Sequence, residues 1–271
     1  MNKKGTIRKI MLVSLWVAIG GGMLTLLIAA MGKQKNETCR DYEITVSADK
    51  GTDLFLDRAE ILKLMKAAAR GNIKGQSKAR INLGQLEQLL EQNQWVKDAQ
   101  VYFDNRDVLK VTVKERVPVA RVFTAGGRSF YVDDANRMMQ LSDKVSTRLP
   151  VFTGFPDKKR LTDSDSVLLN DIRETAVFIT ADPFWNSQVT QVALVSEGAA
   201  GWQMEMVPLV GDHVVRLGDS EGLQQKFDRI YLFYQQVLTK TGFDHYRQID
   251  VRYNGQVVGT KRDYKPKPAK L

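Results

Sequence analysis

The spacing of apolar residues changes twice within residues 83–120, and the remaining segments can be placed around this stretch. Its first part carries leucines three and four residues apart, the spacing of one helical face: Leu83, Leu86, Leu89 and Leu90. Asn82, with Gln85 three residues later, matches an N-terminal capping box. The pattern therefore predicts a short amphipathic helix that begins after Asn82.

From Trp95 onward the apolar period falls to two, which is typical of half-buried strands. Alternation over residues 99–103 and again over residues 109–113 predicts two strands, and the polar residues 104–107 between them predict a turn. An indole at the corner between a helix and a strand is expected in the core. Because a lone hairpin is only marginally stable, another strand and helix must cover it.

The missing strand and helix are predicted just upstream. Apolar residues that alternate with polar ones indicate the strand: Tyr42, Ile44 and Val46. Asp57, with Glu60 three residues later, predicts the capped start of a second helix. The resulting order is strand, helix, helix, strand, strand, a β-α-α-β-β arrangement. We therefore expect an α+β domain at residues 42–115 with one small core.

Beyond the junction at residues 115–118 the pattern becomes a series of short strands with two helices. Expected strands lie at residues 119–124, 129–132, 138–141, 149–154, 189–196, 202–207, 213–217, 248–253 and 255–259. Apolar residues at helical spacing predict the two helices near residues 168–179 and 220–238. We therefore expect a larger mixed β domain at residues 116–260, followed by a disordered basic tail at residues 261–271.

Residues 10–32 carry no charged side chain, and as a helix they are long enough to cross a hydrocarbon core of about 30 Å. The pattern predicts one transmembrane helix, with residues 1–9 as a head and residues 33–41 as a linker. Four of the first nine residues are basic, which favours a cytoplasmic head and extracytoplasmic domains. The alternative is a signal peptide cleaved near residues 30–32, whose apolar core would be unusually long.

Composition limits the chemistry that the chain offers. Of the 271 residues 43% are hydrophobic, and much of the net charge of +9 comes from the two ends, so a basic face for nucleic acid is not expected. Cys39 is the single cysteine, and His213 and His245 are the two histidines. Motifs for a nucleophile, a metal or a phosphate are absent. We therefore expect no catalytic residue, cofactor, metal site or small-molecule substrate, with a secreted enzyme using paired carboxylates as the open alternative.

Several short motifs resemble those of one protein family and occur in its order. They are Trp95-Val96, Val111-x-Val113-x-Glu115-Arg116-x-Pro118-Val119-Ala120, Tyr131-Val132-Asp133, Leu149-Pro150-Val151-x-x-Gly154, Leu217-Gly218-Asp219 and Ile249-Asp250-Val251-Arg252-Tyr253. Behind the predicted membrane helix, this series resembles the bacterial cell-division family FtsQ/DivIB. The resemblance implies one membrane helix, a POTRA-type domain and a larger β domain. Thr260 departs from it, since an aromatic residue sometimes stands at that place.

The resemblance also implies a function. It points to a bitopic scaffold of the divisome, single-pass in the bacterial inner membrane and recruited to the division septum. Its implied partners are the bitopic proteins FtsB and FtsL, and the septal peptidoglycan synthase pair FtsW and FtsI, which the scaffold helps to regulate. The alternative is a membrane-anchored POTRA-type accessory protein of polypeptide transport.

The final predicted strand suggests how a partner would bind. We hypothesise that it is an open sheet edge that accepts a strand from an FtsB-like partner. The candidate contact residues are Tyr253, Asn254, Gly255, Gln256, Val257 and Val258. The alternative is that the tail at residues 261–271 covers this edge. At the domain junction, Glu115 and Arg116 are expected to form a local ion pair.

Overall fold

The described residues form two compact units that divide between Glu115 and Arg116, with Phe55 belonging to the second. The computed structural model describes residues 14–26, 37–47, 55–69, 71–142, 147–158, 160–198 and 201–262. We refer to the two parts as the N-terminal unit and the C-terminal unit.

A helix covers residues 14–26, and its side chains are exposed. Within the ranges given above, no helix combines the length and the apolar character needed to cross a membrane. The membrane segment predicted at residues 10–32 lies partly outside the described residues. The predicted head at residues 1–9 lies wholly outside them, as does most of the tail at residues 261–271.

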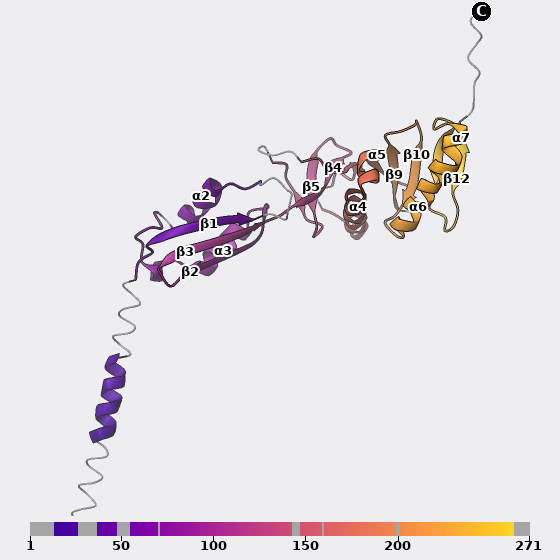
Figure 1. The fold of residues 1–271 in the computed structure, drawn as a ribbon. Helices are drawn as coiled ribbons and strands as arrows, with labels where there is room; N and C mark the ends of the chain where they lie inside the picture. The colour runs from indigo at the N-terminus through magenta and orange to yellow at the C-terminus, as the bar shows by residue number, and fades with distance from the viewer. Residues whose placement is uncertain are drawn as a thin grey trace, which may run out of the picture. The chain divides into compact units, whose positions relative to one another are not determined.

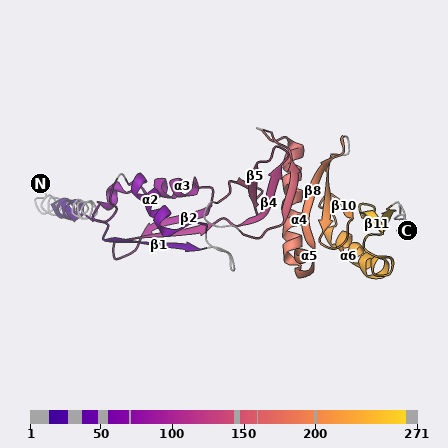
Figure 2. The same ribbon diagram turned by 90° about the horizontal axis from the view of Figure 1, so that it is seen from above.

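The N-terminal unit has the predicted β-α-α-β-β order (Figure 1). Its elements are β1 (Asp41–Ser47), α2 (Arg58–Ala68), the 3-10 turn η1 (Lys78–Arg80), α3 (Leu83–Glu91), β2 (Val96–Phe103) and β3 (Val108–Glu115). The strands form one sheet in the order β1-β3-β2, in which β1 runs parallel and β2 antiparallel to β3. Helices α2 and α3 lie on the same side of this sheet (Figure 2).

Local signals in the sequence account for both helices. The Asp57 side chain accepts a hydrogen bond from the Glu60 amide at 2.7 Å, and Asn82 accepts one from the Gln85 amide at 3.0 Å. Both predicted N-terminal caps are therefore confirmed. Trp95 is only 7% exposed, which confirms its prediction as a core residue.

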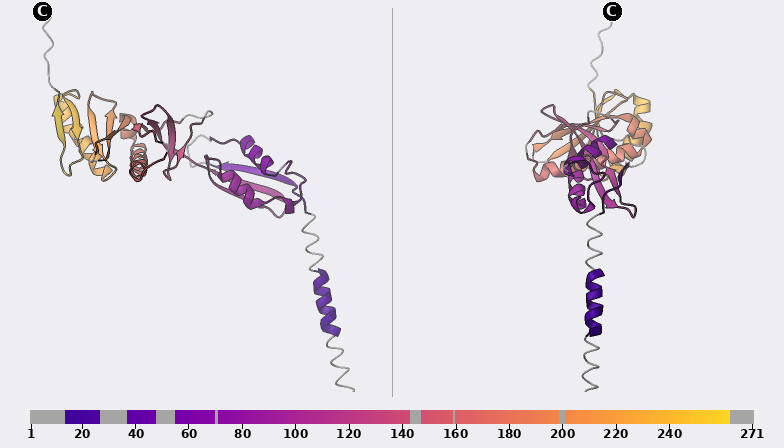
Figure 3. Two further views of the ribbon diagram at one scale, coloured as in Figure 1. Left: turned by 180° about the vertical axis from the view of Figure 1, so that it is seen from behind. Right: turned by 90° about the vertical axis from the view of Figure 1, so that its left-hand side faces the viewer.

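The C-terminal unit is built on a nine-stranded mixed sheet in the order β12-β11-β10-β9-β8-β7-β4-β5-β6. The strands are β4 (Pro118–Thr124), β5 (Ser129–Asp133), β6 (Met138–Met139), β7 (Val151–Phe155), β8 (Val189–Ser196), β9 (Trp202–Pro208), β10 (Val214–Gly218), β11 (Tyr246–Asp250) and β12 (Val258–Lys261). Figure 3 shows the same unit from behind, with its yellow C-terminal elements at one end. Strands β6 and β12 are thus the two edges of one sheet.

The helices of this unit pack into one apolar core with the sheet. They are α4 (Asp163–Ala181), α5 (Pro183–Gln188), α6 (Leu223–Phe233), the π-helical turn η3 (Tyr234–Leu238) and α7 (Thr239–Thr241). The ring of Phe178 on α4 lies 4.8 Å from that of Phe227 on α6, so both helices share one face of the sheet. The prediction of two helices missed α5, which Asp182 caps and Pro183 begins.

The junction residues each have a buried partner in their own unit. Arg116 Nη1 lies 2.6 Å from Asp133 Oδ2, and the two side chains are 5% and 0% exposed. Glu115 Oε1 accepts a hydrogen bond from the Leu56 amide at 2.5 Å. Arg116 therefore tethers the start of β4 to the end of β5.

Candidate partner-binding site

Among the described residues, β12 is an edge of the nine-stranded sheet and has β11 as its single neighbour (Figure 1). The two strands are antiparallel, with Asp250 opposite Val258 and Gln248 opposite Thr260. An edge strand presents main-chain N–H and C=O groups that no second strand pairs. These groups are the main feature of the site.

The hydrogen-bond pattern shows which residues of β11 point toward β12. The Val251 amide donates to the Arg216 carbonyl of β10 at 3.2 Å, so the main chain of Val251 faces β10. Strand residues alternate in the side to which their main-chain groups point. Gln248 and Asp250 therefore face β12.

The opposite residues of β12 follow from this register. Thr260 and Val258 pair with β11 through their main chains, so the main-chain groups of Gly259 point outward. Beyond the bulge in β11, the Arg262 amide donates to the His245 carbonyl at 3.0 Å, which turns Lys261 outward as well. An incoming strand would therefore bond to Gly259 and Lys261.

An aromatic ring supports one face of this edge. An added Cβ on Gly259 would come within 2.6 Å of Tyr246 Cε1, so the Tyr246 ring lies directly over this glycine. The Phe233 ring on α6 packs edge-on against Tyr246, with 5.3 Å between centroids. Val258 at the start of the strand is 45% exposed. The edge therefore offers an exposed apolar side chain, Val258, beside the backbone of Gly259, against which the Tyr246 ring packs.

The structure corrects the predicted position of the final strand. Tyr253, Asn254 and Gly255 form a turn in which Gly255 has a φ of 70° and the Gln256 amide donates to the Tyr253 carbonyl at 3.2 Å. Val257 follows this turn and packs partly against the core. Val258 alone of the six candidate residues lies in β12, because the turn takes up the chain before it. Lys261, predicted to start the tail, instead ends the strand.

A polar hollow of about 470 Å³ lies beside the turn between β11 and β12. It is lined by Asp219, Glu221, Gly222, Gln225, Lys226, Arg229, Arg252 and Asn254. Arg229 Nη2 donates to the Val251 carbonyl at 2.8 Å, and Lys226 Nζ lies 2.8 Å from Asp219 Oδ1. Three cationic side chains and two acidic ones, Asp219 and Glu221, thus line a hollow beside the turn that leads into the edge strand.

Arg252 is the best-anchored of these cations. Its Nη2 lies 2.7 Å from Asp250 Oδ2, its Nη1 lies 3.2 Å from Glu197 Oε2, and its guanidinium lies 5.9 Å from the centre of the Tyr253 ring. Burial alone would raise the pKa of Asp250, but the hydrogen bonds and charge of Arg252 outweigh it and lower that pKa. The pair therefore stays ionised and fixes the end of β11.

Within the described part of the chain, no group of three or more His, Cys, Asp or Glu side chains could hold a metal ion. His213 is 3% exposed, and its Nε2 lies 2.9 Å from the Tyr234 hydroxyl in the core. The arrangement at β12 is suited to binding an extended chain through its backbone, with charged side chains beside it.

Sequence reasoning missed several residues of this site. Gly259 and Lys261 form the outward edge, and Lys226 and Arg229 come from α6. A lysine on an edge strand is a known signal of protection against aggregation and could have extended the predicted strand to Lys261. The approach of α6 to the turn between β11 and β12 has no such local signal.

Comparisons with known proteins match both units. The model of the family described as FtsQ/DivIB, C-terminal related, matches residues 117–260, and that of a POTRA-like domain matches residues 37–114. The cell division protein FtsQ of Salinibacter ruber (strain DSM 13855 / M31) is 26% identical over 173 residues. That alignment covers 62% of this chain and 65% of the relative, just under two thirds of the relative's length.

Proposed function

This chain belongs to the FtsQ/DivIB family, and on that premise we propose that it is a non-catalytic scaffold of the bacterial divisome. In this proposal the protein is bitopic, with its N-terminus in the cytoplasm and both units outside the inner membrane at the septum. It binds FtsB-like and FtsL-like partners and through them helps to regulate the FtsW/FtsI synthase pair. The family, and the resemblance of the matched relative, support this assignment.

The observation that carries the proposal is the open edge at β12. Gly259 and Lys261 direct their main-chain groups away from β11, and an added strand would satisfy them. Main-chain hydrogen bonds would supply affinity, and the exposed Val258 would supply an apolar contact. We propose that the FtsB-like partner contributes this strand.

The polar hollow gives the proposed contact a charge preference. Lys226, Arg229 and Arg252 lie next to the turn that leads into β12, and Asn254 of that turn lines the same hollow. A partner with acidic side chains near its added strand would gain charge-assisted hydrogen bonds there. Tyr253, 54% exposed beside Arg252, offers a flat apolar surface at the rim.

The direct test of strand addition uses a substitution that removes a single outward N–H. Proline is tolerated on an edge strand where its nitrogen faces solvent, so Lys261→Pro should fold. We expect Lys261→Pro to weaken capture of the FtsB-like partner at least about tenfold, while Lys261→Ala, which keeps the N–H, stays within about twofold of wild type. Equal capture of the partner by both variants would refute the proposal that a partner strand adds at β12.

Two further measurements separate the alternatives. If the tail covers the edge, deletion of residues 263–271 should strengthen capture, whereas an open edge predicts no change. A fluorescent fusion should form bands at midcell if the protein acts in division, while a uniform peripheral signal would favour the transport alternative. Depletion in the host should produce filaments without septa, and normal division would refute the assignment.

A further inference from the structure

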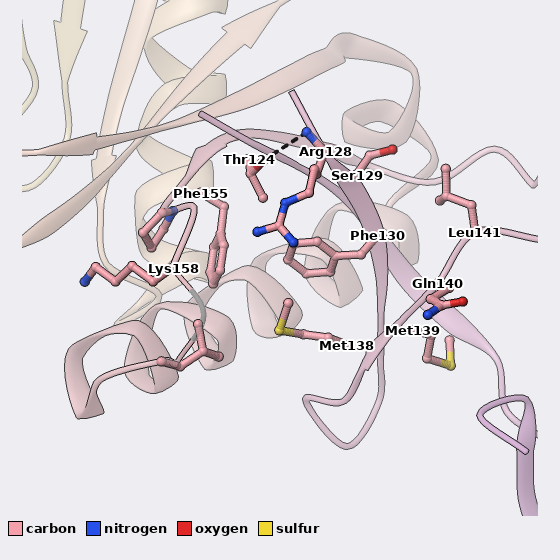
Figure 4. A pocket seen from close by; sticks show the side chains of 12 residues that line it. Thr124, Arg128, Ser129, Phe130, Met138, Met139, Gln140, Leu141, Phe155 and Lys158 are labelled. Carbon is pink, nitrogen blue, oxygen red and sulfur yellow. Dashed lines mark hydrogen bonds between the residues drawn. The ribbon is translucent and has the colours of Figure 1, made fainter. Parts of the chain in front are cut away.

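A second hollow lies at the opposite edge of the same sheet, beside β6. It has a volume of about 700 Å³ and opens between β5, the segment after β6 and the loop that follows β7 (Figure 4). Because β6 and β12 are the two ends of the nine-stranded sheet, this hollow is separate from the candidate site at β12. It lies wholly within the C-terminal unit.

In the described part of the chain, no strand pairs with the start of β5 at this hollow. Strand β6 pairs with β5 at Tyr131 and Val132 and no further toward the start of β5. The Asp133 amide donates to the Arg137 carbonyl at 3.1 Å, so Asp133 faces the β6 side, and Tyr131 and Ser129 do so by alternation. The N–H and C=O of Ser129 therefore point into the hollow, with no described strand opposite them.

The floor of the hollow is apolar. The rings of Phe130 and Phe155 meet edge to face with 5.4 Å between centroids, and these residues are 8% and 1% exposed. Leu161 packs partly against the same core, and Met138 is 45% exposed at the rim. A flexible methionine beside rigid rings suits a surface that adapts to an inserted side chain.

The rim of the hollow is cationic where it meets solvent. The side chain of Arg128 is 69% exposed and that of Lys158 is 48% exposed. Each cation has a less exposed carboxylate partner. Arg128 Nε lies 2.9 Å from Asp157 Oδ1, whose side chain is 33% exposed, and Lys158 Nζ lies 3.1 Å from Asp165 Oδ2, whose side chain is fully buried. An approaching molecule therefore meets two cations beside an apolar floor, and Figure 4 shows the Arg128 side chain next to the ring of Phe130.

We propose that this hollow is a second docking site, which takes an extended acidic segment of a protein partner alongside β5. The segment would continue the ladder at Ser129, insert an apolar side chain over Phe130 and Phe155, and place carboxylates by Arg128 and Lys158. Charge complementarity selects this occupant, because at each ion pair of the rim the cation is more exposed than its carboxylate partner, so an approaching segment meets the positive charges first. Docking here leaves β12 open, so one sheet holds two partners at once.

The test measures binding of the full-length protein to a labelled peptide by fluorescence anisotropy. The probe is a capped octapeptide that alternates Glu and Val, and the comparison peptide alternates Lys and Val. We expect saturable binding of the acidic peptide that weakens as salt is raised, and no saturable binding of the basic one. Arg128→Glu and Met138→Asp should each weaken binding at least about tenfold.

Matched variants distinguish this site from others. Arg106→Glu makes the same charge change on an exposed arginine of the N-terminal unit and should leave binding within about twofold. Arg128→Glu also breaks the ion pair with Asp157 and could lower stability. Met138→Asp breaks no ion pair, so it tests the hollow independently of that effect. Because the acidic peptide can also add at β12, the titrations are repeated in the Lys261→Pro background, and binding that persists there and is lost with Met138→Asp belongs to this hollow. Unchanged binding in both hollow variants, or self-association that these variants abolish, would overturn the proposal.

Discussion

The Tyr246 ring of β11 lies directly over Gly259 of β12, at a place where a Cβ on Gly259 would come within 2.6 Å of Tyr246 Cε1. Any side chain at this position must push the ring away from its contact with Phe233. Overpacking of this kind costs about 1–3 kcal/mol. We expect Gly259→Val to lower the free energy of unfolding by that amount and to speed hydrogen exchange in β12. Thr260→Val, one residue later on the same strand, should be close to neutral in both measurements.

The buried pair between Arg116 and Asp133 gives a prediction about stability. Removing one member leaves the other charge buried, which costs about 3–5 kcal/mol. We expect Arg116→Ala to lower the free energy of unfolding of the C-terminal unit by that amount in chemical denaturation. Arg128→Ala is the matched control, because its pair with Asp157 is exposed to solvent and should contribute about 0–1 kcal/mol. Equal losses in both variants would contradict the importance of burial.

His213 should make stability depend on pH. Burial lowers its pKa below the ordinary value of 6.5, although the Phe243 backbone and the charges of Asp212 and Asp244 act in the opposite direction. The unfolded chain therefore takes up a proton that the folded core excludes, so stability is full above pH 6.5 and falls as the pH drops below it. Thermal unfolding between pH 7.5 and 5.5 would measure this loss.

The two histidines provide the control for that experiment. We expect His213→Leu to flatten the pH dependence of the unfolding temperature over this range, since the titrating group is gone. His245 is exposed, and His245→Gln should leave the wild-type dependence in place. If the unfolding temperature of the His213→Leu variant depended on pH as steeply as that of the wild type, other titrating groups would be responsible.

One edge of the N-terminal sheet is protected by a helix side chain. The Val101 amide of β2 donates to Glu87 Oε1 of α3 at 2.8 Å. Because hydrogen bonds to a charged group contribute about 1.5–3 kcal/mol, Glu87→Ala should destabilise this unit by that order. The freed edge should also raise self-association in analytical ultracentrifugation. Gln88→Ala, an exposed neighbour on the same helix, should change neither quantity.

The sequence by itself determined the local parts of this protein. The caps at Asp57 and Asn82 and the core position of Trp95 depend on short-range patterns, and the structure has each of them. The β-α-α-β-β order followed from the change of period between helix and strand, because that period is a property of each segment alone.

Only the tertiary structure decided the site. That β12 lies at an edge, that Gly259 and Lys261 face outward, and that Arg229 of α6 reaches the end of β11 all depend on pairings between distant segments. The final strand, predicted at residues 255–259, instead spans Val258–Lys261, because the chain at Gly255, with a positive φ, is still in a turn. Hydrophobic period reports which face a residue is on, but it does not report which strand lies beside it.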